Sequence, residues 1–213
     1  MKPYQNQNSS KKKQVEKMFD SISFEYDKLN RLISAGNDVK WRKKIYEIAF
    51  PLNPIDILDI ATGTADIALE LSKIKGSKII GLDISEKMLN VGRQKVTDRS
   101  LENRVSLVSG DAENLSFSKN TFDLISIGFG VRNFQNLEKG LSESFRVLRE
   151  GGTLIILETS VPQNKFVKFF YLLFSRTFIP LIGSLFSKDK KAYNYLQKSA
   201  EEFPSGENFS LIL

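Results

Sequence analysis

Apolar and polar residues follow each other along the chain in blocks that predict strands and helices in regular succession. Short apolar runs of strand length alternate with stretches that carry an apolar residue every three or four positions, as in an amphipathic helix. The expected strands are Ile55–Asp59, Lys78–Leu82, Val105–Ser109, Phe122–Ile127 and Thr153–Glu158, and the expected helices are Ala65–Ile74, Glu86–Arg93 and Leu137–Leu148. This alternation predicts an α/β fold with a mainly parallel sheet, right-handed crossovers and helices on both faces.

The N-terminal part adds helices ahead of the first strand. Residues 1–13 are polar and are expected to form a disordered tail. From Gln14 onward, apolar residues at helical spacing predict one long helix. The residues on its apolar face are Val15, Met18, Phe19, Ile22, Tyr26 and Leu29. A second helix is expected over Asp38–Phe50, with Asp38 as its N-cap.

Residues 166–186 form a dense apolar and aromatic segment. Its length would permit a membrane span. Lys168, Arg176 and Pro180 interrupt the segment, and Pro180 together with Gly183 is expected to break a helix. Because charge inside a bilayer is costly, we favour a helical cover over a site, and leave contact with a bilayer surface open.

Composition narrows the possible chemistry. The chain of 213 residues has no cysteine and no histidine, which excludes disulfides and the usual general base. We expect no metal, and any proton transfer must use Asp, Glu, Lys, Tyr or water. The net charge of +6 suits an anionic partner or a membrane surface, although Lys11, Lys12 and Lys13 are expected to be a solvated part of the tail. No apolar signal segment is present, so we expect a cytoplasmic protein.

The most informative motif is Ile55–Asp66, in which a strand ending in Asp59 runs into a turn of small residues and the start of a helix. Such a turn lets a ligand approach the backbone closely. The next strand ends in Asp83, where an acid can bind a ribose. A dinucleotide site needs three glycines in the turn, and this turn has only Gly63. The pattern favours S-adenosylmethionine over NAD, with a different nucleotide left open.

A third acid follows the third strand. Asp111 and the backbone of Ala112 could read the exocyclic amine and a ring nitrogen of adenine. Each acid also has a structural interpretation, because Asp59 and Asp111 could stabilise turns and Asp83 could cap a helix, although Ser85 suits that role better. Acids at the carboxyl ends of three consecutive strands nevertheless favour a ligand site.

These residues resemble a known family. Ile57–Asp66 resembles the first motif of class I methyltransferases, and more specifically of the ubiquinone/menaquinone biosynthesis C-methyltransferases, with a turn that looks more like the menaquinone branch. The other stretches that agree are Met18–Asp20, Tyr26–Asp27, Gly81–Leu89, Gly128–Asn133, Leu157–Ser160, Tyr195–Ser199 and Phe203–Pro204. The resemblance covers nearly the whole chain after residue 14, and Gly128–Asn133 is among its more specific parts.

The resemblance implies a Rossmann-like class I methyltransferase fold with two extra N-terminal helices and a helical insertion after the fifth strand. It implies S-adenosylmethionine as the cofactor and C-methylation of demethylmenaquinol to menaquinol as the activity. The candidate cofactor-binding residues are Asp59, Gly63, Thr64, Asp83, Ile84, Asp111, Ala112 and Gly128. After the tail, residues 14–213 are expected to form one domain, with a helical lid (14–50), a cofactor-binding core (55–160) and a hydrophobic substrate-covering insertion (163–200).

Arg132 is the candidate catalytic residue. A guanidinium near a phenol lowers the pKa of the phenol and stabilises the phenolate that attacks the methyl group; a surface salt bridge is the alternative interpretation. The candidate substrate-binding residues are Tyr26, Arg132, Asn133 and Glu158. Asp66, Glu158 and Tyr26 are further candidates for accepting a proton or positioning the ring.

Members of the family continue past a helix expected near Glu207 into two last strands that this sequence lacks. Thr153–Glu158 is therefore expected at an exposed edge of the sheet. Two other functions stay open: methylation of the polyprenyl-methoxy-benzoquinol precursor of ubiquinone, and binding of S-adenosylmethionine without catalysis. The expected partner is an isoprenoid hydroquinone and not a nucleic acid. A peripheral position on the inner face of the membrane and a homodimer also stay open.

Overall fold

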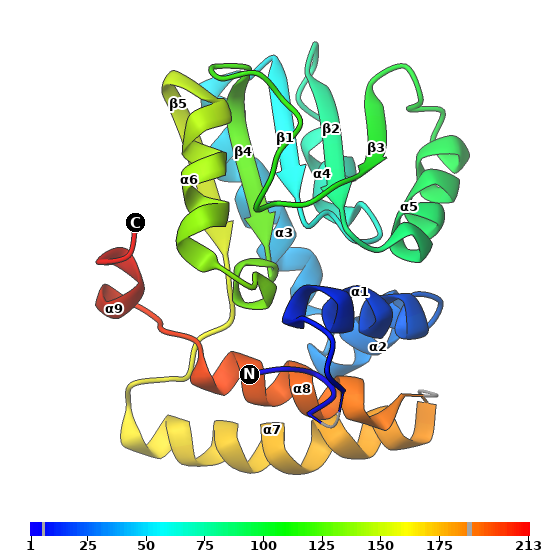
Figure 1. The fold of residues 1–213 in the computed structure, drawn as a ribbon, viewed down its shortest axis with the longest axis vertical. Helices are drawn as coiled ribbons and strands as arrows, with labels where there is room; N and C mark the ends of the chain where they lie inside the picture. The colour runs from blue at the N-terminus through cyan, green and yellow to red at the C-terminus, as the bar shows by residue number, and fades with distance from the viewer. Residues whose placement is uncertain (6, 187–188) are drawn as a thin grey trace.

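The computed structural model describes residues 1–5, 7–186 and 189–213, and its centre is a sheet of five parallel strands. The strands are β1 (Asp56–Ile60), β2 (Lys78–Asp83), β3 (Val105–Ser109), β4 (Phe122–Gly128) and β5 (Leu148–Leu157). Their order in the sheet is β3-β2-β1-β4-β5, so β5 forms one edge, as expected. All the carboxyl ends lie at the same end of the sheet (Figure 1). The predicted α/β fold with a parallel sheet is confirmed.

Helices cover both faces of this sheet because alternate strand residues are buried on opposite sides. Ile57 packs in a cluster with residues of α3 (Asn37–Ala49), α4 (Asp66–Leu71) and α5 (Glu86–Asp98). Its neighbour Leu58 packs in the cluster on the other face, which includes Val147 of α6 (Leu137–Val147). Figure 1 shows α6 in front of the sheet, with α3 and α4 behind it.

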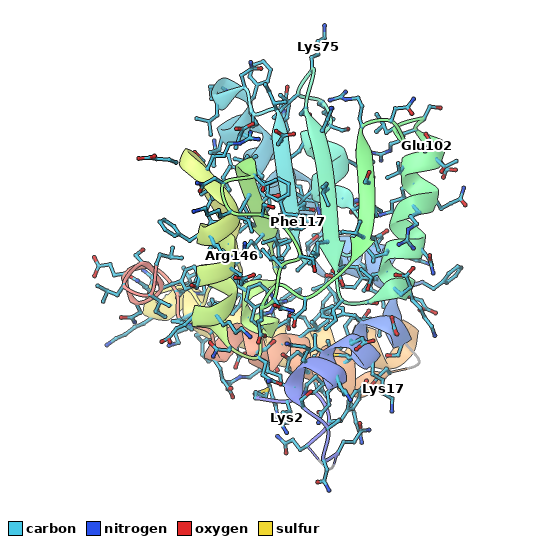
Figure 2. All side chains as sticks on the ribbon, turned by 45° about the horizontal axis from the view of Figure 1, so that its top comes forward. Lys2, Lys17, Lys75, Glu102, Phe117 and Arg146 are labelled. Atoms are coloured by element: carbon cyan, nitrogen blue, oxygen red, sulfur yellow. The ribbon has the colours of Figure 1, made fainter. Side chains whose placement is uncertain are left out.

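The segment between β3 and β4 completes the cover beside α6. Arg146 of α6 donates hydrogen bonds to the carbonyls of Leu115 at 2.9 Å and Phe117 at 2.8 Å. The Phe117 ring meets Phe122 edge-on, with centroids 5.1 Å apart. Figure 2 shows Phe117 and Arg146 on the same face of the molecule. This packing fixes the path of the chain that leaves the end of β3.

A second layer of helices lies beyond the carboxyl ends of the strands (Figure 1). It consists of α1 (Lys11–Ile22), α2 (Tyr26–Ile33), α7 (Lys165–Phe186) and α8 (Lys190–Glu202), with the short α9 (Glu207–Ser210) after them. Its own core contains Val15, Met18, Ile22, Leu29, Met88, Ala192, Tyr193 and Tyr195. In Figure 1, α7 lies farthest from the sheet, and α8 lies between them. The predicted helical insertion after the fifth strand is confirmed.

The N-terminal part differs from the prediction, because in residues 1–5 and 7–55 three α-helices precede β1 where two were expected. The apolar spacing continues from α1 into α2, but a turn at residues 23–25 separates them. Asp20 accepts a hydrogen bond from the Ser85 hydroxyl at 2.6 Å, which holds the end of α1 against the start of α5. The chain must therefore turn before α2 can pack on α3 and α7. Helix α1 also begins at Lys11, which places all three lysines in the helix.

The cap of α3 is also not the predicted one. Its N-cap is Gly36, which has a left-handed φ of 78°, a conformation that glycine adopts freely. Asp38 instead lies in the first turn, where it accepts hydrogen bonds from the hydroxyl of Ser34 at 2.9 Å and from Arg42 at 2.6 Å. A capping residue and an ion-pair partner look alike in the sequence.

Two breaks expected in the C-terminal half are absent. The predicted turn at residues 149–152 is a bulge inside β5, because Phe122 pairs with Leu148 and Leu124 pairs with Thr153. Helix α7 also continues through Pro180. A proline removes one helical hydrogen bond, and contacts of α7 with α8 and α2 support the helix despite that loss. Among residues 1–5, 7–186 and 189–213, no helix is both long and apolar enough to cross a membrane.

Candidate functional site

A cleft with an empty volume of about 700 Å³ lies at the carboxyl ends of β1, β2 and β4. Both the core and the helical layer contribute to its wall. It is lined by six of the predicted cofactor residues, Gly63, Asp83, Ile84, Asp111, Ala112 and Gly128, and by Tyr26 and Asn133. The structure therefore brings these residues together around one space, although they come from distant parts of the sequence.

The turn after β1 has an unusual backbone. Ala61, Gly63 and Ala65 all have left-handed φ angles, of 55°, 55° and 66°. For a residue other than glycine this conformation costs about 1–2 kcal/mol. The turn is supported because the Thr62 N–H donates to the carbonyl of Leu82 at 3.0 Å. The small side chains leave the backbone of this turn open to the cleft.

Asp83 lines the cleft beside this turn. Its carboxylate accepts hydrogen bonds from the N–H of Gly63 and the N–H of Ser85, both at 2.8 Å. Burial raises the pKa of Asp83 to about 6, and these backbone donors oppose that rise. Ser85 is the N-cap of α5, as predicted, because its hydroxyl accepts from the N–H of Met88 at 3.2 Å. Asp83 is thus held in place and keeps acceptor capacity toward the cleft.

Asp59 and Thr64 do not line the cleft. Asp59 is fully buried and accepts hydrogen bonds from the hydroxyls of Thr62 and Ser126, both at 2.6 Å. Burial raises the pKa of Asp59 to about 6 as well. The Thr64 hydroxyl turns away and donates to Asp27 at 2.6 Å. The side chains of these two predicted cofactor residues therefore support the turn from behind.

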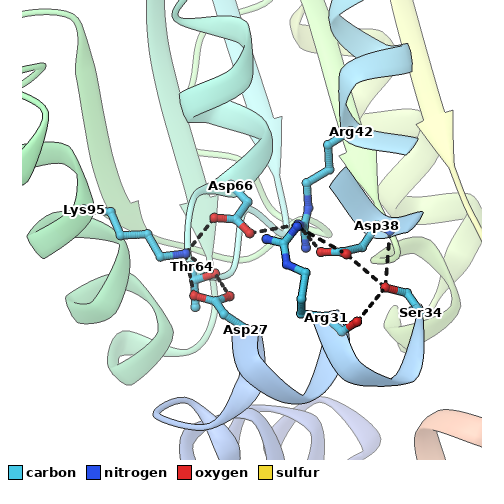
Figure 3. Close-up of polar contacts among 8 residues, drawn as sticks. All are labelled: Asp27, Arg31, Ser34, Asp38, Arg42, Thr64, Asp66 and Lys95. Carbon is cyan, nitrogen blue, oxygen red and sulfur yellow. Dashed lines mark hydrogen bonds and ion pairs between the residues drawn. The ribbon is translucent and has the colours of Figure 1, made fainter. Parts of the chain in front are cut away.

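A chain of ion pairs continues from Asp27 behind the turn (Figure 3). Lys95 of α5 bridges Asp27 at 2.5 Å and Asp66 at 2.6 Å. Arg42 of α3 bridges Asp66 at 2.9 Å and Asp38 at 2.6 Å. Charges from α2, α3, α4 and α5 thus meet at one place. Sequence reasoning did not find this network, because its members are far apart in the chain and share no motif.

Helix α1 lies along the other side of the cleft, and its first lysines, which were expected in the tail, take part in the contacts there. Lys12 pairs with Asp111 at 2.5 Å, and Lys11 donates to the carbonyls of Arg132 at 2.9 Å and Phe134 at 2.6 Å. Lys12, Val15 and Phe19 all line the cleft. Val15 and Phe19 belong to the predicted apolar face of the helix. Lys12 lies on the same face, three residues before Val15, although it was expected in the disordered tail.

A second cleft, with an empty volume of about 1230 Å³, adjoins the first. Tyr26 and Phe129 belong to the walls of both. Phe129 has a left-handed φ of 57° between two glycines, and its ring lies 6.0 Å from that of Trp41. The second cleft is mostly apolar, with lining residues that include Ile33, Trp41, Phe129, Tyr171, Phe174, Ile179, Tyr193, Leu196 and Ala200.

Arg132 lies in the wall of this second cleft, in the short helix η2 (Val131–Asn133). Its guanidinium forms an ion pair with Glu158, and more than nine tenths of each side chain is buried. This excludes a surface salt bridge as the interpretation of Arg132. The neighbouring Asn133 accepts a hydrogen bond from the Tyr195 hydroxyl at 3.1 Å. Of the candidate substrate residues, Tyr26 lines both clefts, Asn133 the first and Arg132 the second, while Glu158 lines neither and contacts Arg132.

The donor set of the first cleft fits S-adenosylmethionine. Asp83 can accept hydrogen bonds from ribose hydroxyls, and Asp111 can accept one from the adenine amine. Asp83, Asp111 and Glu113 make the wall acidic, which suits a positively charged sulfonium ligand and opposes the pyrophosphate of a dinucleotide. The apolar side chains of Leu82, Ile84 and Met88 can pack on the adenine ring.

Comparison with known proteins agrees with this fit. A demethylmenaquinone methyltransferase from Bacteroides fragilis is 45% identical over 208 residues, covering 97% of this chain and 84% of the relative. One from Staphylococcus epidermidis is 43% identical, covering 93% and 82%. The crystal structure of a SAM-dependent methyltransferase from Aquifex aeolicus is 22% identical with a TM-score of 0.56, covering 65% of this chain and 75% of that one, and shows the shared fold.

The family assignment rests on a match that spans nearly the whole chain. The sequence model of the ubiE/COQ5 methyltransferase family matches residues 7–213. This range includes the turn after β1, both clefts and the α7–α8 insertion. The resemblance inferred from the motifs is confirmed, and the chain belongs to the ubiE/COQ5 methyltransferase family.

Proposed function

We propose that this chain methylates a ring carbon of demethylmenaquinol to give menaquinol, with S-adenosylmethionine as the methyl donor. When bound, S-adenosylmethionine supplies a methyl group on a positively charged sulfur. The observation that carries the proposal is the direct contact between an acidic nucleoside cleft and a larger apolar cleft across Tyr26 and Phe129. The names of the relatives at 43–45% identity support the same substrate.

The residues contribute mainly by alignment and by excluding water. Asp83 and Asp111 hold the nucleoside, while the aromatic wall of the second cleft receives a flat ring and an isoprenoid tail. Holding two reactants in line for a displacement supplies a large share of the rate enhancement in such reactions. Arg132 is in the wall of the second cleft, so its positive charge would stabilise the phenolate of a quinol bound there.

The assay that tests this proposal supplies S-adenosylmethionine with reduced demethylmenaquinone or with the reduced ubiquinone precursor. We expect a methylated product by mass spectrometry from the menaquinone substrate. Faster methylation of the ubiquinone precursor would overturn the choice of substrate. Binding of S-adenosylmethionine by calorimetry with no product from either quinol would instead indicate a protein that binds the cofactor without catalysis.

Replacement of Arg132 by alanine separates a catalytic role from a structural one. We expect Arg132→Ala to lose turnover by about 100-fold or more, with the affinity for S-adenosylhomocysteine nearly unchanged. Arg149→Ala is a suitable control, because Arg149 forms ion pairs with Asp123 and Asp56 at the opposite end of the sheet. Equal losses of turnover and cofactor affinity in Arg132→Ala would show that the residue is structural.

We further propose that α7 places the protein on a membrane surface. Phe166, Phe169, Phe170 and Leu173 of this helix are between 52% and 73% exposed. An amphipathic helix with exposed aromatic side chains can bind at the interface between lipid and water. The net positive charge of the protein favours anionic lipid. Such a position would bring the second cleft close to a substrate dissolved in the bilayer.

Flotation with vesicles tests this surface. We expect the protein to float with vesicles that contain about a third phosphatidylglycerol, and the double variant Phe169→Glu/Phe170→Glu to lose most of that binding. Phe145→Glu is the matched control, since Phe145 is 80% exposed on α6. Unchanged flotation of the double variant would contradict the proposal. Sedimentation of the same variants tests the alternative of a homodimer, because a second copy is the other occupant that this face could take.

A further inference from the structure

Methylation of a quinol ring requires a group that accepts the hydroxyl proton, and the chain has no histidine to do so. The candidates are the acids and tyrosines around the second cleft. Burial raises the pKa of Tyr26 and Tyr171, and raises that of Tyr195 to about 12. These phenols therefore remain protonated near neutral pH and cannot act as the acceptor.

Most of the acids near the second cleft are already saturated by partners. Asp38 is bound by Ser34 and Arg42, with Arg31 also within 3.5 Å. Both oxygens of Glu201 are held by Arg176, and Ser175 and Gln197 also donate to this carboxylate. Each oxygen of Asp38 and Glu201 therefore already accepts a hydrogen bond from a protein donor.

Glu158 differs from these acids. Its Oε1 atom accepts hydrogen bonds from Arg132 and from the N–H and hydroxyl of Thr159, at 2.8 and 3.2 Å for the latter two. Its Oε2 atom is buried and has no hydrogen-bond partner within the described part of the chain, and the same is true of Nε of Arg132. A buried carboxylate oxygen without a donor is unfavourable, so the fold alone does not explain it.

The position of Glu158 relates it to the second cleft. Arg132 and Thr159, which together hold Oε1, are both in the wall of that cleft. Glu158 follows the last residue of β5, and so belongs to the same end of the sheet as Asp83. Glu158 itself stands behind that wall, so a substrate hydroxyl would have to enter between Arg132 and Thr159 to reach its Oε2 atom.

We propose that Glu158 accepts the hydroxyl proton of the quinol, with Arg132 holding the carboxylate in position; this inference rests on the proposed function. The O–H bond breaks and its proton goes to Oε2. The ring carbon beside the phenolate then forms a bond to the methyl group as the methyl–sulfur bond breaks. Loss of the ring C–H proton to solvent restores the aromatic ring, and Glu158 returns its proton to the oxygen. One proton is released overall.

The test replaces Glu158 by glutamine, which keeps the size of the side chain and an acceptor for Arg132. We expect Glu158→Gln to lower kcat about 100-fold or more near pH 7, with the affinity for S-adenosylhomocysteine within about twofold of wild type. At higher pH the hydroquinol ionises by itself. The deficit of Glu158→Gln should therefore shrink about tenfold per pH unit, while kcat of the wild type changes little.

Glu201→Gln is the matched control, because Glu201 also pairs with an arginine, Arg176, close to the same cleft. Any loss in this variant should be the same at every pH. A second measurement uses hydroquinols whose ring substituents make them more acidic: Glu158→Gln should recover with increasing acidity, and Glu158→Asp should retain part of the wild-type rate.

The outcomes separate the two proposals. A deficit in Glu158→Gln that stays constant with pH and with substrate acidity would show that Glu158 only holds Arg132, and would overturn the inference. If Glu158→Gln does not fold, the wild type alone provides the test. A steep increase of its rate with the acidity of the substrate would also overturn the inference. Absence of turnover in the wild type would instead count against the proposed function.

Discussion

At the scale of single residues, burial decides what each carboxylate can do. Asp59 near the end of β1 and Asp83 at the end of β2 belong to neighbouring parallel strands, and burial raises the pKa of each to about 6. The sequence predicts both as ligand-binding acids, because acids at the carboxyl ends of strands are typical of such sites. It could not show that Ser126 lies opposite Asp59 on β4 and donates to it. That pairing depends on strand register, so only the structure separates the supporting acid from the binding one.

The raised pKa of Asp83 predicts a pH dependence of cofactor binding. Below about pH 6, Asp83 is protonated in the folded protein and loses acceptor capacity, so the dissociation constant of S-adenosylhomocysteine should rise as pH falls. Calorimetry between pH 5 and pH 8 (roughly the range set by this pKa) measures the effect. Asp83→Asn should bind about tenfold more weakly and without this pH dependence, whereas the exposed Glu86→Gln should behave as wild type. An unchanged affinity at low pH would contradict a role for Asp83 in binding.

The raised pKa values of Asp59 and Asp83 also affect stability, and here a fall in pH is favourable. Between about pH 4 and pH 6 the folded protein binds more protons at Asp59 and Asp83 than the unfolded chain, whose carboxyls titrate near their ordinary pKa. These two groups therefore make the folded state more stable as pH falls through 6, because protonation removes the cost of burying their charges. A fall in pH should therefore weaken cofactor binding, while protonation of Asp59 and Asp83 does not unfold the protein.

At the scale of elements, α1 is the part whose role was hardest to predict. Its three lysines suggest a solvated tail, yet Lys11 reaches the carbonyls of Arg132 and Phe134, and Lys12 reaches Asp111. These contacts connect residues separated by about a hundred positions, and nothing local in the sequence signals them. By contrast, the strands of the core and their following helices could be predicted, because each is encoded by its own short pattern.

The contact between Lys12 and Asp111 predicts that α1 retains the bound cofactor. Lys12→Ala should release S-adenosylhomocysteine several-fold faster in a stopped-flow experiment, since α1 would open more often. The stability of the protein should change by less than about 1 kcal/mol, because both side chains of this ion pair remain about 30% exposed. Lys13→Ala serves as the control on the same helix. Equal release rates in the two variants would show that α1 does not act as a lid.

At the scale of the whole molecule, the sheet and the insertion were predictable, and the way in which the helical layer packs was not. Alternating patterns indicate a parallel sheet, whose carboxyl ends then locate the nucleoside cleft. The contacts of α7 with α8 and α2 join remote segments, and they also allow α7 to continue through Pro180. The second cleft depends on that packing, so the sequence could name Arg132 and Glu158 but could not show that they form an ion pair beside this cleft.

Helix α7 separates two environments. Tyr171 and Phe174 line the second cleft, whereas Phe166 and Phe169 are exposed on the outside. Moving an isoprenoid tail from lipid into water costs about 0.8 kcal/mol for each methylene-sized group, or roughly 4 kcal/mol for each five-carbon unit. An enzyme that had to extract the proposed substrate whole would lose this energy with every added unit. If α7 lies on the bilayer, as proposed, only the ring and the part of the tail that the second cleft receives have to leave the lipid, and further units of the tail then have little influence on the rate.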